Sequence, residues 1–184
     1  MTVRELHILE LIAQGYAAAL SRVGDRWSSP TPCTDWDVSG LIDHVVGGNR
    51  YTSRILAGDS SEAAISFAVA SFSGGSATAD DAVGSFREMA AAFDDVDLDD
   101  LREHVAGRLG VATILRLRMH DALVHLSDLQ IALDLEVPLA SQPIEWALQD
   151  LDDAASTTTR HFKLGGLDAS ITDDERRYLA AFGR

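Results

Sequence analysis

Three residues have the side chains and the spacing to bind a metal ion. Asp121 and His125 lie four residues apart in a segment that reads as a long helix, and His44 lies in a second amphipathic segment, residues 38–56. Side chains four apart share one face of an α-helix, so Asp121 and His125 can reach the same ion. Two histidines and one carboxylate leave coordination positions open for water or substrate. The sequence therefore raises the hypothesis of a divalent-metal site, provided that the two segments meet.

The segment at residues 111–135 has apolar side chains on two opposite faces of a helix. One face holds Leu115, Met119, Ala122, Leu126, Leu129 and Leu133, and the other holds Leu117, Val124, Ile131 and Leu135. A helix that is apolar on both sides packs against neighbours on both sides, as in the interior of a bundle. One of the two polar strips between these faces must then face the bundle axis, and we expect it to be the strip with Asp121 and His125. His120, about 100° away around the helix, is expected to face outward.

Glycines surround His44 on its side of the segment at residues 38–56. On a helical wheel Gly47, Gly48 and Tyr51 share the sector of His44, and each glycine inside a helix costs about 1 kcal/mol relative to alanine. Missing side chains at these positions predict open space beside the imidazole, as a ligand pocket requires. We therefore expect Gly47, Gly48 and Tyr51 to line a substrate pocket.

Each of these residues also has a plainer interpretation. A single interior histidine such as His44 is more often a hydrogen-bonded core residue than a ligand, and an Asp–His pair four apart is commonly a surface ion pair. Asp128 is either a second carboxylate that orients one of the histidines or a solvated side chain. Cys33 is predicted to be a small buried packing residue rather than a nucleophile, because no neighbouring charges would activate its thiol. Spacing alone leaves the choice between a metal site and these alternatives open.

The dominant period along the chain is helical, without strong β-alternation or an internal repeat. Helices are expected at about residues 2–24, 38–56, 61–70, 79–93, 111–135, 144–162 and 173–182. Asp37 is placed to cap the helix that follows it, and the acidic run at residues 94–100 is expected to be a solvated linker. Four long helices, additional short helices and one long connection predict an all-α four-helix bundle. We expect one domain, residues 1–184, with a loosely packed tail from residue 165.

The composition narrows the class of protein. With 15 basic and 29 acidic side chains the net charge is −14, which would repel nucleic acid and anionic lipid. No run approaches about 18 uninterrupted apolar residues and the N-terminus has no signal-peptide pattern, so neither a membrane span nor secretion is expected. The single cysteine suits a reducing compartment, and we expect a cytoplasmic monomer or homodimer.

Two runs of residues resemble the motifs of a known superfamily. The first is Trp27-x-x-Pro-Thr-Pro-Cys-x-x-Trp-x-Val-x-x-Leu-x-x-His44, followed by Gly47-Gly-Asn49, and the second is Arg118-x-x-Asp121-x-x-x-His125-x-x-Asp128-Leu129. Both are similar to motifs of the DinB-like superfamily, in the branch around mycothiol-dependent maleylpyruvate isomerase. Within that branch the chain looks like a group of uncharacterised small actinobacterial metal-binding proteins, over nearly its whole length.

This resemblance implies a DinB-like four-helix bundle that holds a divalent metal between its helices. His44, Asp121 and His125 match the metal-binding positions, with zinc, nickel or iron as the ion and mycothiol as a thiol cofactor. The isomerase has glutamate at the position of Asp121 and an additional C-terminal domain, for which this chain ends too early, so its own substrate is not expected here. The implied function is a metal-dependent thiol transferase or isomerase acting on a small-molecule thiol or electrophile. The alternative is a non-catalytic metal- or ligand-binding protein, such as a sensor or stress accessory protein.

Overall fold

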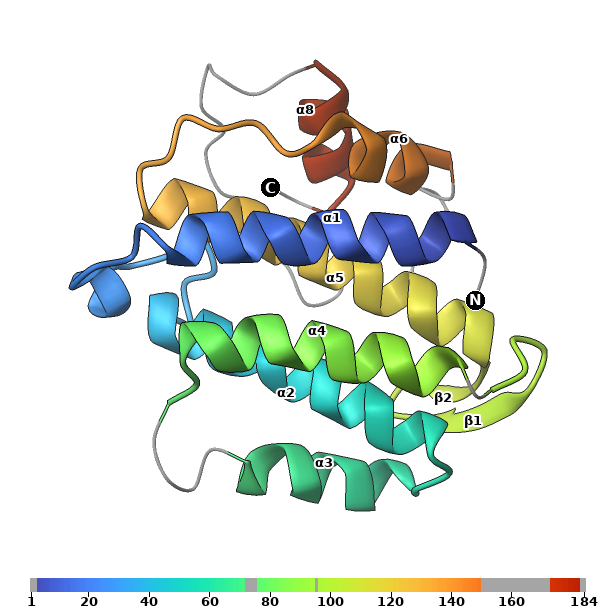
Figure 1. Cartoon of the computed structure of the whole chain (residues 1–184). Helices are drawn as coiled ribbons and strands as arrows, with labels where there is room; N and C mark the ends of the chain where they lie inside the picture. The colour runs from blue at the N-terminus through green and yellow to red at the C-terminus, as the bar shows by residue number, and fades with distance from the viewer. Residues whose placement is uncertain (1–2, 72–75, 95, 150–172, 183–184) are drawn as a thin grey trace.

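Four long helices pack side by side around a common core (Figure 1). The computed structural model describes residues 3–71, 76–94, 96–149 and 173–182. Its elements are α1 (Val3–Leu20), the 3-10 turn η1 (Arg26–Ser28), α2 (Val38–Leu56), α3 (Ser61–Ala70), α4 (Ala79–Asp94), β1 (Leu101–His104), β2 (Gly107–Gly110), α5 (Val111–Ala132), α6 (Ser141–Gln149) and α8 (Asp173–Ala181). The predicted all-α helical bundle is confirmed, with one small hairpin added.

The long helices contact one another in a closed ring. α4 packs on α1 and α2, and α5 packs on the same two helices from the other side. Tyr16 of α1 is fully buried in the core, where its hydroxyl donates a 2.8 Å hydrogen bond to the carbonyl of Ala122 in α5. The buried hydroxyl is therefore satisfied, and it ties two helices that are far apart in sequence.

The interior position predicted for residues 111–135 is confirmed by the burial of α5. From Arg118 to Gln130 every residue is buried except Asp121, which is partly exposed. α5 therefore touches neighbours on nearly all sides, as its two apolar faces require. None of the described helices, α5 included, is long and apolar enough to cross a membrane.

α2 begins where the sequence predicts. The carboxylate of Asp37 accepts a 2.9 Å hydrogen bond from the backbone N–H of Gly40, which satisfies one of the first amide groups of the helix. The first helix is shorter than predicted, because α1 ends at Leu20 and a turn follows, with Gly24 at a φ of 54°. α5 likewise ends at Ala132 instead of residue 135, and Asp134 adopts a positive φ of 49°.

The hairpin of β1 and β2 was not predicted from the sequence. The strands pair antiparallel from Leu101 opposite Gly110 to His104 opposite Gly107, and Gly107 has a φ of 111°, which favours glycine. Both strands are short and largely exposed, so they carry no alternation of apolar and polar residues. The sequence predicted no regular structure between the acidic run at residues 94–100 and the helix that begins at residue 111, and the hairpin lies in this interval.

The C-terminal part of the chain is described in two pieces. The described part of the helix expected at residues 144–162 is α6, and residues 150–162 lie outside the described residues. Residues 165–172 of the expected tail also lie outside them. The rest of that tail includes α8, which packs on α6. Tyr178, Leu179 and Phe182 are fully buried and belong to the main core.

A candidate metal centre between α2 and α5

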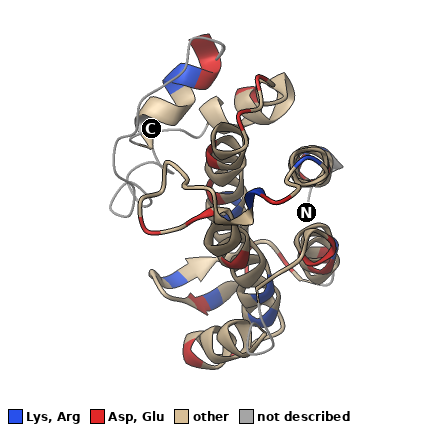
Figure 2. Cartoon of the chain, turned by 90° about the vertical axis from the view of Figure 1, so that its left-hand side faces the viewer, with Lys and Arg blue, Asp and Glu red and all other residues tan. Residues whose placement is uncertain are grey.

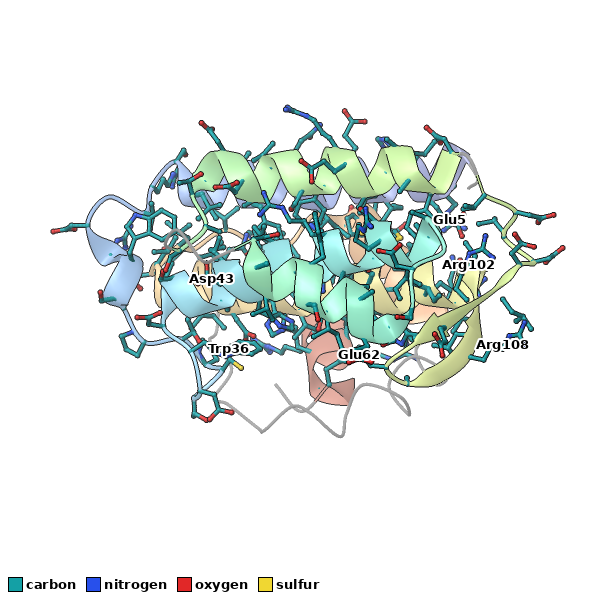
Figure 3. All side chains as sticks on the ribbon, turned by 90° about the horizontal axis from the view of Figure 1, so that it is seen from below. Glu5, Trp36, Asp43, Glu62, Arg102 and Arg108 are labelled. Atoms are coloured by element: carbon teal, nitrogen blue, oxygen red, sulfur yellow. The ribbon has the colours of Figure 1, made fainter. Side chains whose placement is uncertain are left out.

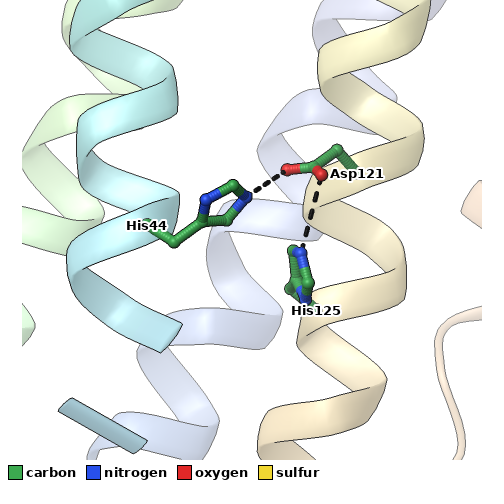
Figure 4. Close-up of side chains that lie close together, drawn as sticks. All are labelled: His44, Asp121 and His125. Carbon is green, nitrogen blue, oxygen red and sulfur yellow. Dashed lines mark hydrogen bonds and ion pairs between the residues drawn. The ribbon is translucent and has the colours of Figure 1, made fainter. Parts of the chain in front are cut away.

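The side chains of His44, Asp121 and His125 converge between α2 and α5 (Figure 4). Nε2 of His44 lies 3.2 Å from Oδ2 of Asp121, and Nε2 of His125 lies 3.5 Å from the other carboxylate oxygen, Oδ1. One nitrogen or oxygen atom from each residue lies within 4.8 Å of those of the other two. The structure thus brings together the three residues that their chemistry had singled out.

Asp128 contacts His125 through the other nitrogen of the imidazole ring. Its Oδ2 lies 2.9 Å from Nδ1 of His125, and both side chains are only 1% exposed. A carboxylate that binds Nδ1 directs Nε2 toward Asp121, so the orienting role of Asp128 fits the structure and the solvated one does not. Burial alone lowers the pKa of His125, but the charges and hydrogen bonds of Asp121 and Asp128 outweigh it and raise that pKa to about 9.

Arg118 balances the charge of Asp121, a role that the sequence did not reveal. Its Nη1 donates a 2.6 Å hydrogen bond to Oδ2 of Asp121, and its Nε donates a 2.9 Å bond to Oδ1 of Asn49 in α2. The amide of Asn49 in turn donates to Ser85 of α4 over 2.9 Å. Burial raises the pKa of Asp121, but Arg118, His44 and His125 together hold it well below its usual range. Asp121 is therefore an ionised carboxylate.

Gly48 lines the cavity beside His44, as the sequence predicted, and it also leaves space for the guanidinium of Arg118. A Cβ atom at Gly48 would lie 2.1 Å from Nη1 and 2.8 Å from Cζ of Arg118, which no side chain permits. A Cβ at Gly40 would lie 3.2 Å from the Cβ of Trp36. Gly40 and Gly48 therefore leave room for the side chains of Trp36 and Arg118, both of which lie beside the cluster.

Trp36 covers one side of His44. The two rings stack with their centroids 4.4 Å apart and an interplanar angle of 23°, and the indole also meets the ring of His125 edge-on at 5.6 Å. Figure 3 labels Trp36 in the loop that precedes α2. The side chain of His44 is 33% exposed whereas that of His125 is 1% exposed, so a small molecule would reach the cluster from the side of His44.

A cavity of about 380 Å³ opens beside the cluster. Its lining consists of Cys33, Trp36, His44, Gly48, Tyr51, Thr52, His104, Val105, Ala106, Ile114, Leu117, Arg118, Asp121 and His125. Gly48 and Tyr51 thus line the cavity, as expected, whereas Gly47 lines a shallower groove that adjoins it. Cys33 is partly exposed at the cavity and is not the buried packing residue that was predicted.

The hairpin closes one side of this cavity. The hydroxyl of Tyr51 accepts a 3.0 Å hydrogen bond from the backbone N–H of Val105, and its ring meets that of His104 at 5.5 Å. The sequence assigned no role to His104, because nothing in it predicted the turn that carries this histidine to the cavity.

His120 does not face outward, so that prediction is wrong. Its side chain is fully buried, its Nδ1 lies 3.1 Å from the hydroxyl of Tyr178, and its ring packs against Trp146 and Phe182. Burial, assisted by the charge of Arg116, lowers the pKa of His120 to about 4. The helices α6 and α8 cover this face of α5, and their packing was not visible in the pattern of α5 itself.

Comparison with known proteins agrees with the resemblance in the motifs. Two uncharacterised proteins of Mycobacterium tuberculosis, from strains CDC 1551 and H37Rv, are each 48% identical to this chain over 40 residues. That match spans 21% of this chain and 22% of each relative. No solved structure matches the chain significantly.

A sequence model of one family covers most of the bundle. The model describes the mycothiol maleylpyruvate isomerase N-terminal domain and matches residues 9–130. This range contains His44, Asp121 and His125, together with Arg118 and Asp128, and it runs from α1 to the last turn of α5. The chain therefore belongs to the mycothiol maleylpyruvate isomerase N-terminal domain family.

Proposed function

We propose that His44, Asp121 and His125 hold a divalent metal ion, and that the protein is a metal-dependent enzyme of the thiol-transferase or isomerase kind. The observation that carries the proposal is the convergence of two imidazole nitrogens and a carboxylate oxygen within 4.8 Å, at the wall of a cavity. This donor set suits zinc best, and nickel or iron also accept it.

The surroundings of the three residues support the fit. Asp128 occupies Nδ1 of the buried His125, which leaves Nε2 directed at the cluster. Arg118 occupies Oδ2 of Asp121 and keeps this carboxylate ionised. Metal-binding histidines and carboxylates are commonly held by such partners, because a fixed ligand binds an ion more tightly than a mobile one.

The cavity suits a reaction between two small molecules. When bound, the ion supplies Lewis acidity that lowers the pKa of a thiol or a water molecule beside it. Trp36 packs on one face of the His44 ring, and the hairpin lines one side of the cavity, whose volume of about 380 Å³ lies in the range of small-molecule sites. The family's name suggests mycothiol as the thiol, with a small electrophile as the second reactant.

Metal analysis of protein purified without chelator tests the proposal. Wild-type protein is expected to carry about one equivalent of a divalent metal, and His44→Ala is expected to lose it. His104→Ala is the matched control, because His104 lines the same cavity but lies outside the cluster. Wild-type protein free of stoichiometric metal would contradict the metal site.

The enzymatic part of the proposal needs a separate assay. Metal-loaded protein is expected to consume a low-molecular-weight thiol in the presence of a panel of electrophiles, and His44→Ala is expected to be inactive. Metal-loaded protein without any thiol-dependent turnover would contradict the enzyme and favour the non-catalytic metal-binding protein.

A further inference from the structure

The cavity at the cluster continues into a second hollow on the side of α3. A groove of about 580 Å³ shares five lining residues with the cavity, namely Trp36, His44, Gly48, Tyr51 and Val105. His44 therefore stands at the junction of two arms of one cleft. α3, which forms the far wall of the groove, lies over α2 in Figure 3.

The lining of the groove is apolar and open. Ile65 and Val69, four residues apart on α3, are 43% and 67% exposed, and Val105 of the hairpin is 64% exposed. Apart from His44 at the junction with the cavity, only Asp43 among its lining residues is acidic or basic, and the carboxylate of Asp43 accepts a 2.6 Å hydrogen bond from the backbone N–H of Ala77. Exposed apolar residues gathered in a hollow mark a binding surface more often than single exposed ones do.

Another exposed apolar residue of α3 lies outside this surface. Phe67 is 46% exposed, but the guanidinium of Arg54 lies over its ring, 5.0 Å from the centroid, and Phe67 does not line the groove. The helix therefore carries two comparable apolar sites, of which only the one at Ile65 and Val69 opens toward the cluster.

We propose that the groove receives a hydrocarbon part of the small molecule whose polar reacting group lies at the cluster. The substrate class is then an amphipathic molecule with an aliphatic or aromatic arm. The inference rests on the proposed function, since it places the polar group beside His44, Asp121 and His125. The continuity of groove and cavity favours one small molecule that spans both. A second copy of the chain would need about 800 Å² of buried surface per partner, more than three aliphatic side chains supply.

Binding of a series of straight-chain hydroxamic acids to zinc-loaded protein tests the groove. From acetohydroxamic to octanohydroxamic acid, affinity measured by calorimetry is expected to rise about three- to fourfold per methylene group until the groove is filled. The double variant Ile65→Ser/Val69→Ser is expected to flatten this increase. Phe67→Ser is the matched control, on the same helix and equally exposed, and is expected to keep the increase.

Several results would overturn the inference. One is a wild-type affinity that does not depend on chain length, and another is an unchanged increase in the double variant. A wild-type dimer that Ile65→Ser/Val69→Ser converts to a monomer would assign the groove to a second copy. If the protein binds no metal, hydroxamic acids of every length fail alike. The chain-length series is then repeated with the alcohols from butanol to octanol, which need no metal, and equal affinities would reject the groove on its own.

Discussion

Arg118 sets the charge balance of the candidate metal centre. It is 8% exposed and donates to Asp121, which is 19% exposed, so the pair is shielded from water. Removing one partner of such a pair leaves a buried charge without compensation. In metal-free protein the guanidinium therefore supplies the nearest of the positive charges that keep Asp121 ionised, whereas a bound cation would take over part of its role.

Arg118→Met is expected to destabilise metal-free protein by roughly 3 kcal/mol, because Asp121 loses the nearest of its counter-charges. Zinc is expected to recover a large part of this loss in the variant. Urea unfolding with and without zinc measures both quantities, and Arg87→Met, at an exposed position of α4, serves as the control. An equal loss with and without zinc would show that Arg118 acts through packing and not through its charge.

His125 makes the proposed metal binding dependent on pH. Its pKa of about 9 means that the imidazole is protonated at neutral pH in metal-free protein, so a metal must displace a proton. Zinc affinity is therefore expected to fall by up to about tenfold for each pH unit below 9. Calorimetry in buffers of different ionisation enthalpy counts the released protons, and an affinity that is constant between pH 7 and 9 would contradict the expectation.

The same shift changes the stability of the metal-free protein in the opposite sense. Since the folded pKa of His125 is raised above the unfolded value of 6.5, its contribution to stability is complete below pH 6.5 and is lost as the pH rises through about 9. Asp128→Asn removes one of the charges that raise this pKa. Both the affinity change and the stability change are therefore expected to shift to lower pH in that variant.

At the scale of elements, the sequence was most informative where a helix carries its own pattern. The two apolar faces of residues 111–135 predicted an interior helix, which the burial of α5 confirms. Asp37 likewise marked the start of α2 by its capping chemistry. Both features depend on residues within a few turns of one another.

The remaining features depend on contacts between distant segments. His120 is buried because α6 and α8 cover it, and a helical wheel shows the direction of a side chain but not what lies there. The sequence singled out Gly48 as a costly glycine inside a helix, but it did not show that the side chain of Arg118, seventy positions later, fills the space next to it. The hairpin escaped prediction because each strand is only four residues long and carries a single large apolar side chain, Leu101 in β1 and Leu109 in β2.

His120 makes the packing of α8 on α5 sensitive to acid. Its folded pKa of about 4 lies below the unfolded value of 6.5, so the unfolded chain binds a proton first as the pH falls. The protein is expected to lose up to about 1.4 kcal/mol per pH unit between pH 6.5 and 4 from this residue. Nothing is lost above pH 6.5.

His120→Phe removes this titration and leaves the hydrogen bond from Tyr178 to the backbone carbonyl of residue 120. The stability of wild-type protein relative to His120→Phe is therefore expected to decrease on acidification from pH 7 to 5, as measured by urea unfolding. A difference that does not change with pH would mean that His120 is not a neutral buried residue.

At the scale of the whole molecule, the cluster joins helices from both halves of the bundle. α2 contributes His44 and α5 contributes Asp121 and His125, while Ser85 of α4 accepts a hydrogen bond from Asn49 of α2, the partner of Arg118. A ligand held by α2 and α5 at once stabilises the folded chain against global unfolding. Acidic residues are spread over many elements in Figure 2, so the net charge of −14 does not single out one face.

Zinc is accordingly expected to raise the melting temperature of the whole protein. At a concentration about 100 times the dissociation constant the gain is about 2.7 kcal/mol, or roughly 5–10 °C for a chain of this size. His44→Ala is expected to abolish the shift and His7→Ala, in α1 and outside the cluster, to retain it. Equal shifts in the two variants would place zinc elsewhere.

The contact between Gly48 and Arg118 has a consequence for how the family can evolve. The guanidinium occupies the space that any side chain at position 48 would need. A relative with alanine or a larger residue there cannot keep the arginine in this position, and the carboxylate that corresponds to Asp121 then needs another counter-charge. Positions 48 and 118 are therefore expected to change together among relatives: where position 48 is not glycine, position 118 is expected not to be arginine.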